Sequence, residues 1–594
     1  MCAINGITWE DSALVEQMNH ATAHRGPDGT AVAVYRGVTL GHNRLAIIDL
    51  DPRAGQPMSS RSERYSIIFN GEIYNFKDVR EALRGSYQFK TESDTEVVLA
   101  GFEVWGAGIF ERLNGMYALA IHDRDTGTIV LARDPVGVKP LYITKTTKGY
   151  AFSSEIKALL EVGMPRVLNT QAFASYMRTL YVPSPATLLQ GIEKFPAGTI
   201  GTIKDGSISL ERFSYRPQHE PLARGDTQGL RSAVMSAVSR QMVSDRPLGV
   251  YLSGGVDSSV VLASATAAGG NADTFSIGFE LERGEEAEKF NADSIIAKRT
   301  AAHFGARHHE FAISPPDVLG LLEKASYHLD EPIGNATIAA QVALSEKARA
   351  SAVVALTGDG GDEVFGGYPR YLLTRRMDLY QALVPSAVAR RLPFSAAKKI
   401  AVKALEERFA LFHFQKNAEL ERVLNVPVPM PALPQIAPAE NLMEADRVTW
   451  LVDEALMRSD KLGMAHGLET RPPLLDLELL HQVSAIPFEA HVSLFTTKVL
   501  LKRAFQKDLP AWVVNQPKRG WFSPGAKWLR HPALAEPLDA IFAPEYAPGT
   551  ERLFDWDGVR AMLSDHQAKR SYHATPLLSI LMFQLWSRRF NASL

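Results

Sequence analysis

The amino-acid sequence predicts two domains: layered antiparallel sheets first, then a parallel sheet with helices on both faces and a helical end. At 594 residues the chain is too long for a single core. Short apolar runs separated by turn residues dominate up to about residue 200, whereas strands and helices alternate after about residue 215. We place the two domains at residues 2–210 and 225–594.

Residues 2–200 contain a series of short predicted strands. Thr30–Tyr35 and Tyr65–Phe69 are apolar runs with turn residues on either side. Met116–His122 and Thr128–Arg133 flank an Asp-Arg-Asp-Thr-Gly connection that is typical of a hairpin. Glu155–Leu160 is a predicted helix. We therefore expect antiparallel sheets with only a few helices.

The second part alternates between predicted strands and helices. The strand Leu248–Leu252 leads into a Gly-rich loop and a helix, and Thr274–Phe279 is a second strand. The helical stretch Ser294–Phe304 and the strand Val353–Leu356 follow. This alternation predicts a parallel sheet covered on both faces. From about residue 375 the pattern is mostly helical, and it ends in Leu577–Arg589.

Composition and charge exclude several classes of function. The formal net charge of −2 and the lack of a Lys/Arg-rich run give no reason to expect a nucleic-acid partner. No run approaches the roughly 20 apolar residues of a membrane helix, and the start lacks the pattern of a secretory signal. We therefore expect a cytoplasmic protein without a membrane partner. A single cysteine rules out an internal disulfide or a Cys-based zinc site. The oligomeric state stays open, with a homodimer as one candidate.

The single cysteine directly follows the initiator methionine. Removal of Met1, which is expected before a small residue, would leave Cys2 with a free α-amino group. Such a group has an unperturbed pKa of about 7.7–8.0, so it can act as general base for its own thiol. A lone cysteine near a terminus is more often incidental. The catalytic interpretation therefore depends on the segments downstream.

Three downstream segments together offer a partner for each polar group of glutamine. Arg44 suits the carboxylate. Asn70 and the Gly71 N–H, which we place in a turn, suit an oxyanion, while Glu72 and Asp94 suit the ammonium group. Taken singly, these residues are equally consistent with a surface ion pair, a hairpin turn or a helix cap. Their combination predicts a glutamine site.

Cys2, His24–Gly29, Arg44, Asn70–Glu72 and Ser93–Glu96 resemble class II glutamine amidotransferases in order and spacing. The resemblance implies an N-terminal-nucleophile hydrolase fold, a four-layer αββα sandwich. It implies that Cys2 attacks the glutamine amide, forms a glutamyl thioester and releases ammonia. The glutamine-binding residues that it implies are Arg44, Ile47, Ile48, Asn70, Gly71, Glu72 and Asp94.

A Gly-rich loop, Ser253–Ser259, lies between a predicted strand and a predicted helix. Its glycines let the backbone approach a ligand, and the helix N-terminus offers N–H groups to an anion. Nothing in the chain fits the Walker A pattern. On its own, a Gly-rich turn between a strand and a helix is as consistent with a purely structural role as with phosphate binding.

The loop resembles the pyrophosphate loop of ATP pyrophosphatases, which cleave ATP between its α and β phosphates and form an acyl-adenylate. Downstream, Thr274–Phe279, Thr357–Tyr368, a helical signature at Met457–Asp476, and Pro517–Phe522 resemble asparagine synthetases. The resemblance extends from Cys2 to about Phe590. The ATP-binding residues that it implies are Tyr251, Leu252, Ser253, Gly254, Gly255, Asp257, Ser258, Ile277, Thr357 and Gly358.

Adenylation brings a carboxylate against a triphosphate, so Mg²⁺ and basic side chains must neutralise like charges. Asp257 and Asp362, on the two Gly-rich loops, are the predicted Mg²⁺ ligands. Lys518 and Arg471 are expected to offset phosphate or transition-state charge. The resemblance also implies catalytic roles for Asp359 and Lys518.

Two segments depart from the family pattern, and one of them is the stretch before Asn291–Ser294, which lacks the usual acidic pair in full. Asp330–Thr337 has Asn335 where an aspartate is expected and Ala336 where proline is common. The prediction is thus glutamine- and ATP-dependent amidation of a carboxylate through an acyl-AMP, with internal transfer of ammonia and with aspartate as the favoured acceptor. The alternatives are a sugar uronic acid or natural-product intermediate as acceptor, a non-catalytic regulatory or scaffold paralogue, and a plain glutamine hydrolase.

Overall fold

The computed structural model of the chain describes residues 2–270, 272–281, 290–384, 388, 402, 404–412, 415–428, 441–518 and 523–594. Met1, whose removal the sequence predicts, lies outside the described residues. So do residues 519–522 of the segment that carries Lys518.

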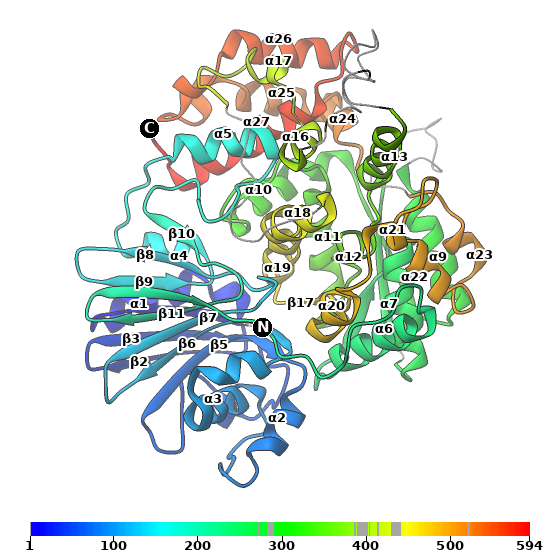
Figure 1. The fold of residues 1–594 in the computed structure, drawn as a ribbon. Coiled ribbons are helices and arrows are strands. Elements are labelled where there is room, and N and C mark those ends of the chain that lie inside the picture. Colours follow the sequence, from blue (N-terminus) through cyan, green and yellow to red (C-terminus); the bar gives the residue numbers. More distant parts are fainter. Residues whose placement is uncertain are drawn as a thin grey trace.

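Two antiparallel sheets of six strands each form the first part of the chain (Figure 1). The first sheet has the order β10 (Ile192–Lys194), β8 (Tyr142–Lys145), β9 (Tyr150–Ser153), β1 (Ala3–Ile7), β3 (Val38–Arg44), β2 (Gly29–Tyr35). The second has the order β12 (Ser207–Arg212), β11 (Thr199–Lys204), β7 (Thr128–Arg133), β6 (Gly115–Asp123), β5 (Tyr65–Ile73), β4 (Met58–Ser59). The predicted hairpin is confirmed, since β6 and β7 pair from Ala118 with Arg133 to Asp123 with Thr128.

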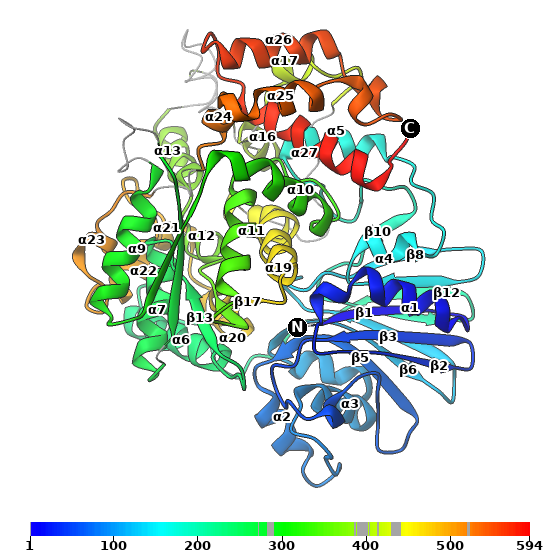
Figure 2. The same ribbon diagram turned by 180° about the vertical axis from the view of Figure 1, so that it is seen from behind.

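Helices cover the outer faces of this pair of sheets. On the first sheet α1 (Ser12–Ala21) packs against β1 and β3 (Figure 2), and α4 (Ile156–Leu160) follows β9. On the second sheet α3 (Asp94–Trp105) packs against β5, and α2 (Phe76–Leu83) packs against α3. The layers are therefore helix, sheet, sheet, helix, which confirms the predicted αββα sandwich.

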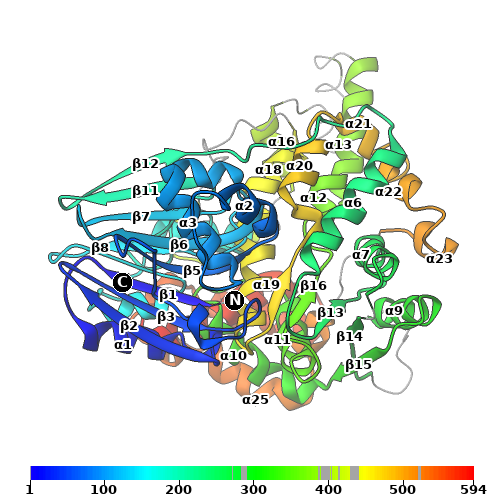
Figure 3. The ribbon, with the colours of Figure 1, turned by 90° about the horizontal axis from the view of Figure 1, so that it is seen from below.

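The second part is built on a five-stranded parallel sheet (Figure 3). Its order is β15 (His308–Ile313), β14 (Asp273–Phe279), β13 (Leu248–Tyr251), β16 (Val354–Leu356), β17 (Glu469–Arg471). One face carries α6 (Thr227–Gln241), α7 (Val256–Ala267) and α9 (Ala292–His303); the other carries α10 (Val318–His328), α11 (Thr337–Ala348) and α19 (Met457–Met464). The predicted parallel sheet with helices on both faces is confirmed.

One strand of this sheet, β17, lies where the sequence indicated a helical segment. The sequence indicates a helical signature for Met457–Asp476, whereas α19 and a short 3-10 turn at Pro473–Leu475 are helical there and Glu469–Arg471 forms β17 beside β16. Three residues are too few to show the alternation of a strand, and all three are buried on the sheet edge, so tertiary pairing decides their conformation.

The helical end of the chain packs against both parts. It contains α25 (Pro532–Ile541), α26 (Trp556–Gln567) and α27 (Ala574–Phe590). Phe173 of α5 (Thr170–Thr179) has its ring centroid 4.5 Å from that of Phe583 in α27, and the Tyr176 hydroxyl donates to the Ser579 carbonyl at 2.8 Å. One hydrophobic core thus runs across both parts. The division at 2–210 and 225–594 stays a prediction. None of the described helices is long and apolar enough to cross a membrane.

Candidate active sites

Cys2 precedes β1 and is buried, with 7% of its surface exposed. Its backbone nitrogen donates to Asn70 Oδ1 at 3.0 Å. The Nδ2 group of Asn70 is buried and has no hydrogen-bond partner among the described residues. Burial raises the pKa of the Cys2 thiol, so the thiol needs a base to become a nucleophile. Asn70 thus holds the nitrogen beside the thiol with one end of its amide and keeps a donor free at the other.

The structure corrects the prediction of a turn at Asn70–Glu72. These residues lie inside strand β5, where Gly71 pairs with Tyr117 of β6. A Cβ atom at Gly71 would lie 2.3 Å from the carbonyl oxygen of Met116. The glycine is therefore required by the close approach of a neighbouring strand, not by a turn.

A small pocket opens beside Cys2. Of the predicted glutamine-binding residues, it is lined by Arg44, Ile47, Ile48, Gly71, Glu72 and Asp94. Asn70 lies behind this surface, in contact with Cys2 through the bond described above. Segments that are far apart in the sequence thus meet in one pocket.

Arg44 is held by the backbone of the loop that follows β3. Its guanidinium donates from Nη1 to the Asp51 carbonyl at 2.9 Å and from Nη2 to the Asp49 carbonyl. The backbone N–H of Asp49 in turn donates to Asp245 Oδ2, in the second part of the chain, at 2.8 Å. The arginine therefore carries a fixed positive charge that no described carboxylate side chain neutralises in an ion pair.

Two carboxylates, Asp94 and Glu72, also line this pocket. Asp94 begins α3 and accepts a hydrogen bond from the Ile73 N–H at 3.0 Å, while burial raises its pKa to about 6. Burial also raises the pKa of Glu72 well above its usual value, and the negative charge of Asp94 adds to the effect. A pocket lined by an arginine and two carboxylates offers partners for both charges of a zwitterion.

The second site is a cavity of about 540 Å³ at the carboxyl ends of the parallel strands. It is lined by Tyr251, Leu252, Ser253, Gly255, Asp257, Ser258, Ile277, Thr357, Gly358, Asp359, Asp362 and Lys518, all of which were predicted. Gly254 does not line the cavity. Its φ is +73°, and a Cβ atom at this position would lie 2.8 Å from the Asp293 carbonyl oxygen. The glycine is therefore a backbone requirement of the loop.

The two predicted metal ligands, Asp257 and Asp362, both line this cavity and converge on one lysine. The amino group of Lys498 pairs with both Asp257 and Asp362, and Lys518 Nζ lies 2.5 Å from Asp362 Oδ2. Burial alone would lower the pKa of Lys498, but the two carboxylates outweigh it and raise the pKa. Sequence reasoning missed Lys498, because an isolated lysine before a helix carries no motif of its own.

Asp359 has a different environment from its neighbours. Its Oδ2 accepts from the Thr357 hydroxyl at 2.9 Å and from the Ser459 hydroxyl of α19 at 2.8 Å. Hydroxyl donors orient a carboxylate without neutralising it. Asp359 therefore presents negative charge to the cavity.

Arg471 does not lie where the sequence suggested. We expected it to offset phosphate charge, but it is fully buried and does not line the 540 Å³ cavity. Its Nη2 lies 3.0 Å from Glu72 Oε2, at the glutamine pocket. The prediction for Arg471 is therefore wrong, because β17 directs this side chain toward the first part of the chain.

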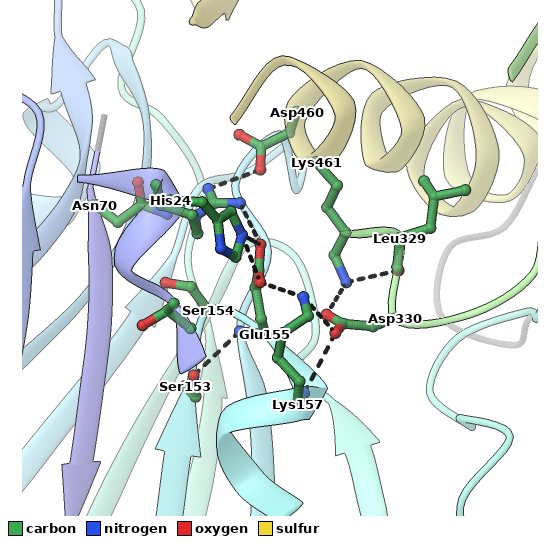
Figure 4. Close-up of polar contacts among 12 residues, drawn as sticks. His24, Asn70, Ser153, Ser154, Glu155, Lys157, Leu329, Asp330, Asp460 and Lys461 are labelled. Atoms are coloured by element: carbon green, nitrogen blue, oxygen red, sulfur yellow. Dashed lines mark hydrogen bonds and ion pairs between the residues drawn. The ribbon is translucent and has the colours of Figure 1, made fainter. Parts of the chain in front are cut away.

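A buried polar network joins the two parts of the chain (Figure 4). Arg25 donates from Nε to the Cys2 carbonyl at 3.1 Å and pairs through Nη2 with Asp460 of α19 at 2.8 Å. Next to it, Lys461 pairs with Asp330 at 2.5 Å, and Lys157 pairs with the same carboxylate at 2.8 Å. The backbone of the nucleophile is thus anchored on the helix that also carries Ser459.

Known protein families match both parts of the chain. The glutamine amidotransferase domain family matches residues 1–214, and the asparagine synthase family matches residues 229–588. Together with the Cys2 pocket, these matches define a glutamine-dependent amidotransferase. The chain belongs to the asparagine synthase family, whose glutamine-hydrolysing members are carbon–nitrogen ligases.

The sequences of named relatives are similar to this chain along most of its length. A putative glutamine-hydrolysing asparagine synthetase of Mycobacterium bovis is 32% identical, over 98% of this chain and 94% of its own length. Glutamine-hydrolysing asparagine synthetase 1 of Bacillus subtilis is 30% identical, over 99% and 96%. Amidase chyE of Penicillium rubens is 24% identical, over 87% and 86%.

Proposed function

We propose that this enzyme moves ammonia from glutamine to a carboxylate activated by ATP, with aspartate as acceptor and asparagine as product. The observation that carries the proposal is the presence, in one chain whose two parts share a hydrophobic cluster, of a zwitterion pocket at Cys2 and a 540 Å³ cavity bordered by a Gly-rich loop and three lysines.

At the first site the Cys2 α-amino group takes the thiol proton, and the sulfur attacks the amide carbon of glutamine. Arg44 binds the glutamine carboxylate, and Glu72 with Asp94 binds its ammonium group. Asn70 Nδ2 and the Gly71 N–H donate to the oxyanion. The α-amino group returns this proton to the departing nitrogen, so ammonia leaves, and water then hydrolyses the thioester to glutamate. The ammonia then crosses the interface inside the protein.

At the second site a carboxylate oxygen of the acceptor attacks the α-phosphorus of ATP, and pyrophosphate leaves. Ammonia attacks the acyl carbon, and AMP leaves with that oxygen. Lys518 and Lys498 offset the negative charge, and Asp359 orients the acceptor or accepts a proton from the incoming ammonia. These roles follow from the residues that border the cavity.

Asp257 and Asp362 fit a magnesium ion. Their carboxylates converge on one cation already, the ammonium of Lys498, and Asp257 Oδ1 is buried with no hydrogen-bond partner among the described residues. The described residues include no group of three or more His, Cys, Asp or Glu side chains placed to hold a metal. Mg²⁺ would therefore take its other ligands from ATP and water, and would neutralise phosphate charge.

A different carboxylate is the second candidate acceptor. Asn335 lines the 540 Å³ cavity and donates from Nδ2 to Glu454 Oε1 at 3.2 Å. The neutral amide stands where the family resemblance predicts an aspartate, so this wall carries one negative charge fewer for an acceptor's ammonium group. A sugar acid or a natural-product carboxylate lacks that group.

One reaction mixture separates these candidates. With Mg-ATP, glutamine and aspartate, we expect asparagine, glutamate, AMP and pyrophosphate in equal amounts. If no asparagine forms and the enzyme instead amidates another carboxylate that is supplied, that carboxylate is the acceptor and aspartate is not. Formation of ADP in place of AMP would refute the acyl-AMP intermediate.

The glutamine pocket should respond to acid. Because burial raises the pKa of Asp94 to about 6, it takes up a proton well above the usual pH for an aspartate and then no longer attracts an ammonium group. We expect the ratio of kcat/KM for glutamine to that for glutaramate, which lacks the amino group of glutamine, to fall by about tenfold between pH 7 and pH 5. Protonation of the Cys2 α-amino base lowers kcat/KM for both amides in this range, so glutaramate serves as the control substrate. Equal profiles for the two amides would contradict the assignment of Asp94.

A further inference from the structure

We propose that Arg471, from the second part of the chain, positions Glu72 so that the Cys2 pocket selects amides that carry an ammonium group. The inference rests on the proposed glutaminase activity at Cys2 and adds to it a specificity-determining residue from the ligase half.

The guanidinium of Arg471 is fixed on three sides. Nη1 donates to the Gln241 and Val243 carbonyls at 2.8 and 2.6 Å, and Nε lies 2.5 Å from Glu469 Oε1. The side chain is fully buried. The remaining nitrogen, Nη2, is thereby directed at Glu72 Oε2, 3.0 Å away. The arginine has no freedom to follow Glu72, so Glu72 must adapt to the arginine.

The two oxygens of Glu72 therefore have different environments. Oε2 is held by Arg471, whereas Oε1 is buried and has no hydrogen-bond partner among the described residues. Glu72 itself lines the pocket beside Cys2. One oxygen is anchored and the other remains for a donor, and the ammonium group of glutamine is such a donor.

Arg471 also favours the charged form of Glu72. Burial and the nearby carboxylates of Asp94 and Glu469 raise the pKa of Glu72, and the guanidinium opposes them. Without a cation at this place, a buried carboxylate takes up a proton and loses its attraction for ammonium. The hydroxyl of Tyr74, whose ring lies 5.7 Å from the Arg471 guanidinium carbon, also borders the cluster but adds no positive charge.

The position of Arg471 is set by the ligase half. It is the last residue of β17, opposite Leu356 of β16. Its backbone carbonyl accepts the Thr357 N–H at 2.8 Å, at the start of the loop that lines the 540 Å³ cavity. The backbone of Arg471 thus holds the loop at the 540 Å³ cavity, whereas its side chain contacts Glu72 at the Cys2 pocket. The amidotransferase sandwich alone therefore lacks part of its glutamine selectivity.

The test compares glutamine with glutaramate in the full-length enzyme. For Arg471→Gln we expect the ratio of the two kcat/KM values to fall about 10- to 100-fold, the loss of one charge-assisted hydrogen bond. The value for glutaramate itself should change little. Arg471→Lys, which keeps the charge, should retain part of the selectivity. A merely structural role would lower both substrates together, and that result would overturn the proposal.

Arg240→Gln is the matched control. Arg240 lies on α6 next to Gln241 and forms a two-bond ion pair with Asp476, at 2.6 and 3.1 Å, without contact to Glu72. The Arg240→Gln variant should leave the ratio of kcat/KM for glutamine to that for glutaramate unchanged. If Arg471→Gln does not fold, Glu72→Gln in the presence of Arg471 must show the same loss of selectivity, and retained selectivity there would also overturn the proposal. A wild-type enzyme that hydrolyses no glutamine would instead refute the function at Cys2.

Discussion

Cys2→Ala is expected to abolish glutamine-dependent product formation and to leave ammonia-dependent formation intact. The rate with glutamine should fall on the order of 10⁴-fold or more, because the variant has no nucleophile. Cys2 is the single cysteine of the chain, so no other thiol can replace it. Its nitrogen, which Asn70 holds at 3.0 Å, and its carbonyl, which Arg25 holds at 3.1 Å, belong to the backbone and persist in the variant.

The measurement is the rate of amide product with saturating glutamine and, separately, with saturating ammonium chloride. Cys2→Ser is the matched control, since it keeps a side chain of similar size with a much weaker nucleophile. If both activities disappear in Cys2→Ala while the protein stays folded, the two-site account is wrong. Persistent use of glutamine would place the nucleophile elsewhere.

Lys518→Met is expected to have the opposite effect. Lys518 Nζ lies 2.5 Å from Asp362 at the 540 Å³ cavity, so its loss removes positive charge where phosphate charge develops. We expect the formation of AMP and amide product to fall by about 10²–10³-fold, with hydrolysis of glutamine unchanged. Separate assays of AMP and glutamate measure the two effects.

Lys502→Met provides the comparison. Lys502 lines the same cavity and is half-buried, but it forms no ion pair with a carboxylate among the described residues. Lys502→Met should lower the formation of AMP and amide product less than Lys518→Met does. Equal effects of the two variants would show that only the overall charge of the cavity matters and would contradict the specific role of Lys518.

The fold was predictable because its strong patterns are local. The hairpin of β6 and β7 and the strand–loop–helix at β13 and α7 appear in the sequence as alternation, turn residues and glycines. The pocket at Cys2 was predictable for another reason: glutamine needs an arginine, carboxylates and an amide, and the chain offers each at a recognisable motif.

The errors all concern contacts between distant segments. Gly71 was assigned to a turn because nothing local reveals that β6 passes so close to it. Arg471 was predicted to offset phosphate charge because the three residues of β17, which direct its side chain toward Glu72, have no pattern of their own. Lys498 was missed because its importance arises only when Asp257 and Asp362, over 100 residues apart in the sequence, converge on it. Such roles depend on tertiary packing.

The most direct test of the central claim is one mass-spectrometric measurement with two labels. The enzyme receives glutamine labelled with ¹⁵N in its amide, aspartate labelled with ¹⁸O in its side-chain carboxylate, Mg-ATP and unlabelled ammonium ions at the same concentration as the glutamine. We predict asparagine that carries ¹⁵N and AMP that carries one ¹⁸O, since nitrogen passes inside the protein and the carboxylate oxygen leaves with AMP. Asparagine dominated by unlabelled nitrogen, or ¹⁸O in inorganic phosphate together with ADP, would contradict it.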